Sequence, residues 1–212
     1  MKKSVVDEIY KELKKQILNQ TFTTEVFSEM QLAEQFHVSK TPVREALNIL
    51  CVEGFISRYP SYGYVLKNMT PMEYQDISEI RFILESGAAK IIIELCTDDE
   101  IRQLYDTLEA PEGAGFNIVN LNFHSKLGEL TKNQILYSEI KRMTEVMSRP
   151  GQYLSFKHKP EGNVWHEKII EALLARDVEE AVRCIKRDLV YIARNETADA
   201  EALSGRDENA KA

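Results

Sequence analysis

Four polar residues stand on stretches whose helical neighbours are apolar, and their side chains are suited to binding. They are Asn120, His124, His166 and Asp188. Asn120 and His124 are four residues apart, so on a helix they project from the same side. Burying such groups without partners would be costly. We therefore expect them to meet one another, a ligand or a metal ion inside a helical bundle, where facing helices commonly build sites.

A second set of polar side chains, near the N-terminus, is of the kind that contacts nucleic acid. Residues 39–53 predict a helix whose buried side carries four apolar residues at helical spacing: Val43, Ala46, Leu47 and Leu50. Its other side carries residue types that reach phosphates and base edges, namely Lys40, Thr41, Arg44 and Asn48. The sequence therefore predicts a recognition helix for DNA.

Local signals place this helix in a helix-turn-helix. Ser39 is a natural N-cap, and Pro42 is tolerated in the first turn. Upstream, Ser28 begins a Ser-x-x-Gln capping box that opens another short helix. An amphipathic helix precedes both, and residues 55–66 predict a small hairpin in which Gly63 permits a close backbone approach. Residues 1–68 therefore predict a winged helix-turn-helix domain.

The rest of the chain predicts a helical bundle. Thr70, Pro71 and Glu73 form a strong helix start directly after the junction at 68–71. Periodicity predicts six helices, near 71–94, 98–109, 116–131, 134–148, 163–175 and 178–196. Residues 69–196 are thus expected to form an all-helical domain, and the polar residues 197–212 a disordered tail. The predicted fold class is mainly α, with one small β-hairpin.

Charge and cysteine content favour a DNA-binding protein of the cytoplasm. Residues 1–69 carry 9 Lys and Arg against 8 Asp and Glu, while the remainder carries 18 against 26. A near-neutral N-terminal part on an acidic body fits local DNA contact rather than a nucleic-acid coat. The three widely spaced cysteines indicate reduced thiols. No apolar run is long enough to span a bilayer, so no membrane association is expected.

The N-terminal residues resemble the winged helix-turn-helix domain of the GntR family of bacterial transcription regulators. The resemblance rests on Leu32-Ala33, on residues 38–47 (VSKTPVREAL), on Glu53-Gly54 and on Gly63. It implies DNA contacts by Ser39, Lys40, Thr41, Arg44, Asn48 and Gly63. The family usually has Arg in place of Lys40 and often in place of Met30. Because Lys does not replace Arg in bidentate guanine contacts, we expect the operator to differ from the family's common one.

The C-terminal residues resemble, more sparsely, the effector-binding FCD domain of the FadR-like branch of that family. The resemblance rests on residues 81–85 (RFILE), on Phe123-His124, on Asn133, on residues 166–172 and on Arg176-Asp177. It implies a metal site of one Asp and three His. Here the four positions carry Asn120, His124, His166 and Asp188. This altered set could hold Zn²⁺, Ni²⁺ or Mn²⁺, with Asn120 as a weak or outer ligand.

The sequence does not decide how the four polar residues of the bundle are used. His124 or His166 could pair with Asp188 without any metal. The resemblance also implies that Arg81 faces the cavity and grips a carboxylate effector, whereas the residue spacing equally allows an ion pair with Glu85 one turn later. Arg142 is a second candidate for effector binding.

The leading functional hypothesis is a transcriptional regulator, as a repressor, rather than an enzyme. A homodimer would place two recognition helices on a palindromic double-stranded operator, and a small organic acid or sugar acid bound in the bundle would bias their arrangement. One alternative is a metal-responsive regulator without an organic effector. The other is a metalloenzyme built on the bundle, against which the DNA-binding domain argues.

Overall fold

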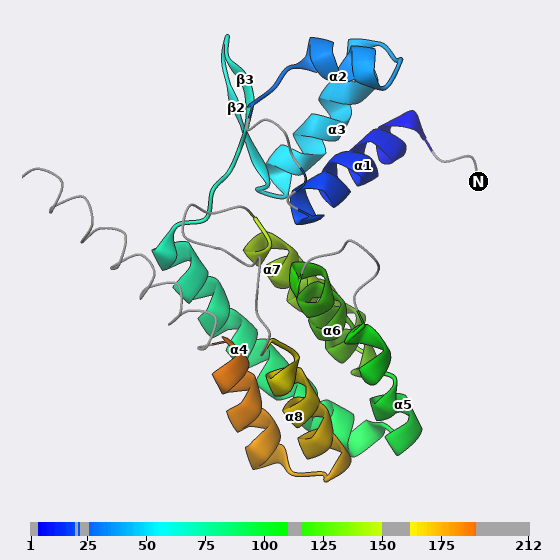
Figure 1. The fold of residues 1–212 in the computed structure, drawn as a ribbon, viewed down its shortest axis with the longest axis vertical. Coiled ribbons are helices and arrows are strands. Elements are labelled where there is room, and N and C mark those ends of the chain that lie inside the picture. The colour runs from blue at the N-terminus through cyan, green and yellow to red at the C-terminus, as the bar shows by residue number, and fades with distance from the viewer. Residues whose placement is uncertain (1–3, 20, 22–25, 110–115, 150–161, 190–212) are drawn as a thin grey trace, which may run out of the picture. The chain divides into compact units, whose positions relative to one another are not determined.

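A computed structural model of the chain describes residues 4–19, 21, 26–109, 116–149 and 162–189. These residues form two compact units: the first contains the residues up to Met69 together with Ser148 and Arg149, and the second contains the other residues from Thr70 onward. Helices dominate both units (Figure 1), which confirms the predicted mainly α fold. None of the described helices is long and apolar enough to cross a bilayer. The predicted tail at 197–212 and the end of the last predicted helix lie outside the described residues.

The first unit is a three-helix core with a small sheet. Its elements are α1 (Val5–Asn19), β1 (Val26–Phe27), α2 (Glu29–Gln35), α3 (Lys40–Val52), β2 (Ile56–Tyr59) and β3 (Gly63–Leu66). Helices α1 and α2 both pack on α3, and the apolar side of α1 supplies Ile9, Leu13 and Ile17 to the shared core. Because each helix buries one apolar stripe against the others, the polar side of α3 faces away from that core.

The sheet has three antiparallel strands, in the order β1-β3-β2. Strands β2 and β3 form the predicted hairpin, with Ser57 opposite Val65. Strand β1 was not predicted: it is two residues long, and Val26 pairs with the distant Val65 rather than with a sequence neighbour. A pairing of that kind leaves no periodicity in a local window of sequence.

Gly63 is required by the sheet itself. Its φ is +117°, and a Cβ at this position would lie 2.6 Å from the backbone oxygen of Phe27 in β1. A side chain would thus meet both an unfavourable backbone conformation and a steric overlap with a neighbouring strand. The glycine is explained by strand packing, without reference to a bound nucleic acid.

Gly63→Ala is therefore expected to lower the free energy of unfolding of the first unit by about 1–3 kcal/mol, the range for a strained backbone position. The measurement is chemical denaturation of the full-length chain. Gly87→Ala is the control, because Gly87 lies inside α4 with no atom within 4 Å of an added Cβ. Alanine there should instead stabilise the helix, by roughly 0.5–1 kcal/mol. Equal stability of the Gly63 variant and the wild type would contradict this account of the wing.

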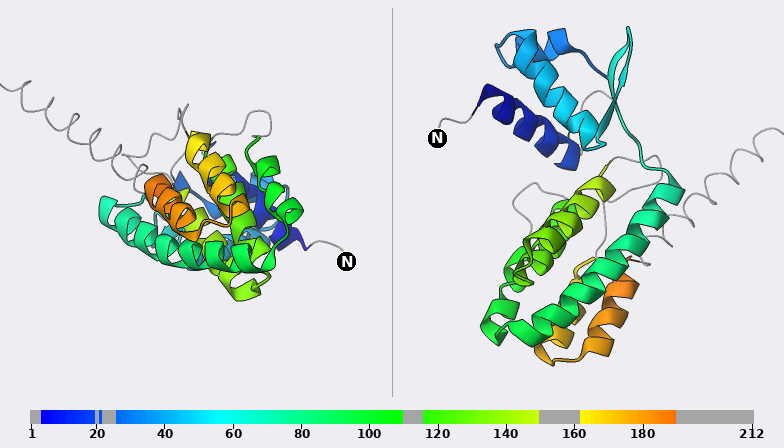
Figure 2. Two further views of the ribbon diagram at one scale, coloured as in Figure 1. Left: turned by 90° about the horizontal axis from the view of Figure 1, so that it is seen from below. Right: turned by 180° about the vertical axis from the view of Figure 1, so that it is seen from behind.

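The second unit is a helical bundle. Its elements are α4 (Pro71–Leu95), α5 (Asp98–Arg102), the 3-10 helix η1 (Tyr105–Thr107), α6 (Phe116–Leu130), α7 (Gln134–Met147) and α8 (Gly162–Leu174), followed by helical residues 178–189. The long helix α4 packs against α6, α7 and α8 (Figure 2). Thr70 and Glu73 form the predicted capping box, with Pro71 as the first helical residue.

The predicted helix over 98–109 is wrong in its second half. The α-helix ends at Arg102, and a 3-10 turn over Tyr105–Thr107 follows it. Ile101 and Leu104 are both fully buried in the bundle core. The Thr107 hydroxyl donates to the backbone oxygen of Leu104, an interaction that competes with regular helical bonding. Tertiary packing and this side-chain bond override the helical periodicity.

Candidate functional site

The outward side of α3 carries the polar residues expected to contact DNA. Lys40, Thr41, Arg44 and Asn48 are exposed, as is Ser39 just before the helix. The opposite side of the helix is buried, through Val43, Ala46, Leu47 and Leu50. Exposed groups on a helix fixed from behind can meet a groove edge without disturbing the core.

Ser39 differs from expectation in one respect. It occupies the N-cap position of α3 with an extended backbone, but its side chain makes no capping hydrogen bond. The predicted caps at Ser28 and Thr70 do form, each accepting from the backbone N–H three residues later, and Thr97 caps α5 in the same way. The Ser39 hydroxyl is thus exposed and not engaged by the helix end that follows it.

Arg44 is held by a residue that the sequence did not single out. Its Nε donates to Glu29 Oε1 over 2.9 Å, and its Nη2 donates to Glu29 Oε2 over 2.7 Å. The Tyr64 hydroxyl donates to the same Glu29 Oε1 over 3.1 Å. One carboxylate of α2 therefore joins α3 to strand β3 of the hairpin. Glu29 escaped sequence analysis because its partners lie 15 and 35 positions away.

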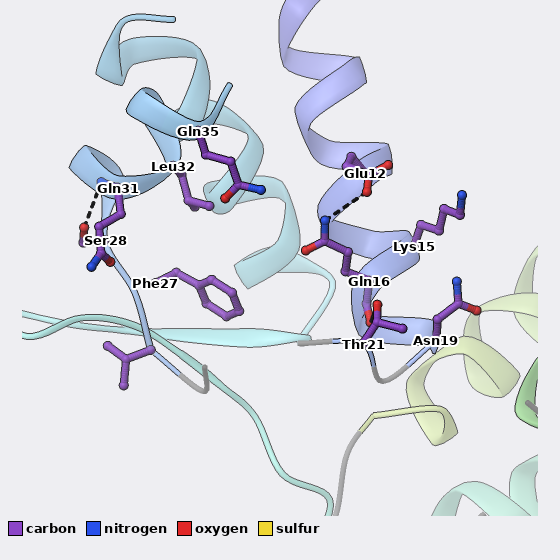
Figure 3. A pocket seen from close by; sticks show the side chains of 11 residues that line it. Glu12, Lys15, Gln16, Asn19, Thr21, Phe27, Ser28, Gln31, Leu32 and Gln35 are labelled. Atoms are coloured by element: carbon purple, nitrogen blue, oxygen red, sulfur yellow. Dashed lines mark hydrogen bonds between the residues drawn. The ribbon is translucent and has the colours of Figure 1, made fainter. Parts of the chain in front are cut away.

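A polar hollow in the first unit lies beside α1 and α2 (Figure 3). Its lining includes Glu12, Gln16, Ser28 and Gln31. Gln16 donates to Glu12, and the Gln31 backbone N–H donates to Ser28. The Gln16 and Ser28 side chains are thus already engaged within the hollow.

The second unit contains the polar cluster expected from the sequence. Asn120 and His124 lie on α6, His166 lies on α8, and Asp188 lies in the helical segment 178–189. All four are buried. The structure thus brings together four residues from three helices, although Asn120 and Asp188 lie 68 positions apart in the sequence. All four side chains are removed from solvent.

Contacts within this cluster centre on two ring nitrogens. His124 Nε2 lies 3.1 Å from Asn120 Oδ1 and 3.2 Å from Asp188 Oδ2. His166 Nε2 lies 3.7 Å from Asp188 Oδ1. The His166 ring stacks on Phe123, with centroids 4.1 Å apart. Asp188 is therefore the carboxylate that both histidines face.

Glu85 is a further member of the cluster, anticipated only as a partner for Arg81. Its Oε1 accepts from Arg81 Nε over 2.8 Å, and its Oε2 lies 2.8 Å from His124 Nδ1. Both side chains of the Arg81–Glu85 pair are fully buried. The cluster thus continues from Asp188 through His124 and Glu85 to Arg81 on α4.

The charges of the cluster stabilise one another. Burial raises the pKa of Glu85, but Arg81 and His124 outweigh it, so this pKa lies below its usual value. Burial likewise opposes ionisation of Asp188, yet His166 and His124 bring its pKa down to about 2. Burial lowers the pKa of His166 to about 4. Both carboxyls are therefore ionised at neutral pH, and the His166 imidazole is uncharged.

This donor set fits a divalent cation. One ligand atom each from His124, His166 and Asp188 can be chosen so that all lie within 4.8 Å of one another. Neutral imidazole and carboxylate together suit Zn²⁺, Ni²⁺ or Mn²⁺. Glu85 beside His124 Nδ1 would hold the tautomer whose Nε2 lone pair faces Asp188, which is how outer carboxylates orient metal-binding histidines.

The two arginines proposed for effector binding lie in different surroundings. Arg81 belongs to the buried cluster, and its Nη1 donates to Met147 Sδ over 3.1 Å. Arg142 is 56% exposed on α7 and pairs with Glu139 over 2.9 Å. The structure therefore does not bring Arg142 to the cluster, because the polar side of α7 that carries it faces solvent.

Comparison with known proteins matches both units to described families. Residues 5–65 match "Bacterial regulatory proteins, gntR family", and residues 76–190 match the FCD domain. The second match alone covers more than half of the chain. FCD domains bind small-molecule effectors.

Individual relatives agree with these matches. The chain is 28% identical over 187 residues to the Nta operon transcriptional regulator of Aminobacter aminovorans, covering 85% of this chain and 87% of that protein. It is 25% identical over 166 residues to the gluconate operon transcriptional repressor of Bacillus subtilis, covering 72% and 68%. The structure of E. coli McbR/YncC shares the fold, with a TM-score of 0.73 at 23% identity over 92% of this chain and 99% of that one. The chain therefore belongs to the GntR family, as a DNA-binding transcriptional regulator with a C-terminal FCD domain.

Proposed function

We propose that this regulator is a cytoplasmic homodimeric repressor whose operator is released when a small organic acid or sugar acid binds its FCD domain. In this proposal residues 1–68 bind DNA, while residues 69–196 dimerise and bind the effector. Two copies of α3 would enter successive major grooves of a palindromic operator. Ser39, Lys40, Thr41, Arg44 and Asn48 would make the contacts, with Gly63 on the wing.

The observation that supports effector binding is the burial and incomplete hydrogen bonding of the Arg81 side chain. Its side chain is fully buried, and its Nη2 makes no hydrogen bond to any residue that the structure describes. A buried guanidinium N–H without an acceptor is unfavourable, and a carboxylate is the acceptor that matches its geometry. An anionic ligand beside Arg81 would satisfy this donor.

The charge balance of the buried cluster supports a carboxylate as the effector when a divalent cation is bound. Arg81 carries one positive charge, and Glu85 and Asp188 carry one negative charge each. A divalent cation held by His124, His166 and Asp188, with both imidazoles neutral, would leave the buried cluster with one excess positive charge. Buried charge requires compensation, which a singly charged carboxylate supplies. When bound, the metal would act as a Lewis acid toward the effector's oxygen atoms.

The experiment is a titration of operator binding with carboxylates and sugar acids. A duplex selected from a random library by the wild-type protein serves as the probe, and binding is followed with metal-loaded and with chelator-treated protein. The proposal expects release of the duplex by at least one acid, more effectively in the metal-loaded state. Release controlled by metal alone, with no response to any acid, would favour a metal-responsive regulator. Insensitivity to both would remove the sensor function.

Metal binding gives a separate prediction. His166→Gln is expected to lower the affinity for Zn²⁺, Ni²⁺ or Mn²⁺ by at least about 100-fold, the upper end of the effect of losing an outer-shell partner. The measurement is metal content after dialysis, together with titration of the demetallated protein. His37→Gln is the matched control, because His37 is exposed in the other unit. Equal retention by both variants would mean that the cluster holds no metal through His166.

A further inference from the structure

The ion pair between Arg44 and Glu29 has a geometry that bears on how DNA is read. Glu29 is the first residue of α2 and Arg44 lies in the second turn of α3. The pair is bidentate, and it uses the Nε and Nη2 atoms of the guanidinium. Two parallel hydrogen bonds fix the plane of the guanidinium, which a single bond would leave free to turn.

The carboxylate is itself fixed in place. The Glu29 side chain is 19% exposed, whereas the Arg44 side chain is 53% exposed. The hydroxyl of Tyr64, a buried residue of β3, donates to Glu29 Oε1. The hydrogen bonds from Arg44 hold the pKa of Glu29 below its usual value. Glu29 is therefore ionised and anchored from behind, while the guanidinium reaches outward into solvent.

We infer that Glu29 is a positioning residue that makes Arg44 a base reader. This inference rests on the proposed contact between α3 and the operator. A guanidinium has five N–H donors in a rigid fork, and Glu29 occupies the Nε–Nη2 edge. The terminal Nη1–Nη2 edge remains directed away from Glu29. That edge can donate two parallel bonds to guanine O6 and N7, the commonest specific arginine contact in the major groove.

Without Glu29, Arg44 would lose this restriction. A flexible arginine can satisfy itself on neighbouring phosphates, which are present at every position of any duplex. The carboxylate also partly neutralises Arg44, and this reduces its attraction to phosphates in general. Glu29 thus favours binding to one sequence over binding to all sequences, although an exposed ion pair adds little to the stability of the fold.

The test compares affinity for the selected duplex with affinity for a scrambled duplex, using the full-length chain. Glu29→Gln keeps the shape of the side chain but removes its charge and one of its two acceptor oxygens. It is expected to lower the ratio of the two affinities by about tenfold or more, with the scrambled duplex bound equally well or better. Glu34→Gln is the matched control, since Glu34 is exposed on the same helix and forms no ion pair within the described residues. Its ratio should not change.

A double variant separates positioning from a structural effect. In the Arg44→Ala background, Glu29→Gln should cause no further loss of discrimination, because its effect passes through Arg44. The inference is overturned if Glu29→Gln binds the selected duplex more tightly than the wild type does. It is also overturned if Glu29→Gln lowers the ratio of the two affinities equally in the wild-type and the Arg44→Ala backgrounds. Unchanged discrimination in Arg44→Ala alone overturns the proposed contact as well. Discrimination lost in Arg44→Ala and kept in Glu29→Gln overturns only the role of Glu29.

Discussion

Replacing Arg81 with alanine is expected to lower the free energy of unfolding of the α4–α8 unit by about 3–5 kcal/mol, the usual cost of removing one partner from a buried ion pair. The Arg81–Glu85 pair is inaccessible to solvent on both sides. Without the guanidinium, the Glu85 carboxylate would lose its permanently charged partner and keep the His124 ring beside it. Desolvation would then favour the protonated form of Glu85, and its bonds to the cluster would weaken.

The measurement is denaturant unfolding of the full-length chain, followed by helical circular dichroism. Arg142→Ala is the matched control, because its ion pair with Glu139 is half exposed and on the surface. Exposed pairs contribute about 0–1 kcal/mol. A similar loss in the two variants would show that burial of the Arg81 pair has no energetic consequence.

Arg81→Lys distinguishes the structural role of Arg81 from its proposed role toward an effector. Lysine keeps the positive charge beside Glu85 but lacks the planar fork that binds a carboxylate with two bonds. We expect this variant to retain more stability than Arg81→Ala while responding more weakly to carboxylates in the operator titration. A full response to the effector in Arg81→Lys would assign Arg81 to the fold alone.

The parts of the fold that the sequence predicted well are those with local signals. The capping box at Thr70 forms as expected because both of its partners lie within one turn. The apolar stripe of α3 predicted which of its sides is buried. Strand β1 depends on a partner almost forty residues away, so no short window of sequence could reveal it.

The candidate metal site was predictable only where local sequence signals pointed to it. Polar residues on apolar helical faces pointed to a buried cluster, and Asn120, His124, His166 and Asp188 do meet. Glu85 was anticipated only as an intrahelical partner of Arg81, since residue spacing alone does not show whether an ion pair is buried. The packing of α6 on α4 decides that question and brings His124 to Glu85.

Replacing Arg44 with alanine is expected to weaken binding to the selected duplex by about 1–3 kcal/mol for each half-site contact, which corresponds to roughly 5–150-fold. The variant should fold normally, because Arg44 is exposed and its partner Glu29 can be hydrated when the pair is lost. Affinity is measured by fluorescence anisotropy over a series of salt concentrations. Arg102→Ala is the control, since Arg102 is an exposed arginine of the other unit with partners of its own.

The salt series decides what Arg44 contacts. If Arg44 bound a phosphate, its loss would weaken all duplexes about equally and would reduce the salt dependence by one released counterion. If it binds a guanine edge, as the Glu29 clamp suggests, its loss should relax discrimination at one base pair of each half-site and change the salt dependence little. Unchanged affinity for the selected duplex at every salt concentration would mean that the exposed side of α3 is not the recognition surface. Lys40, Thr41 and Asn48 would then lack the role proposed for them, since the same side of the helix presents all three.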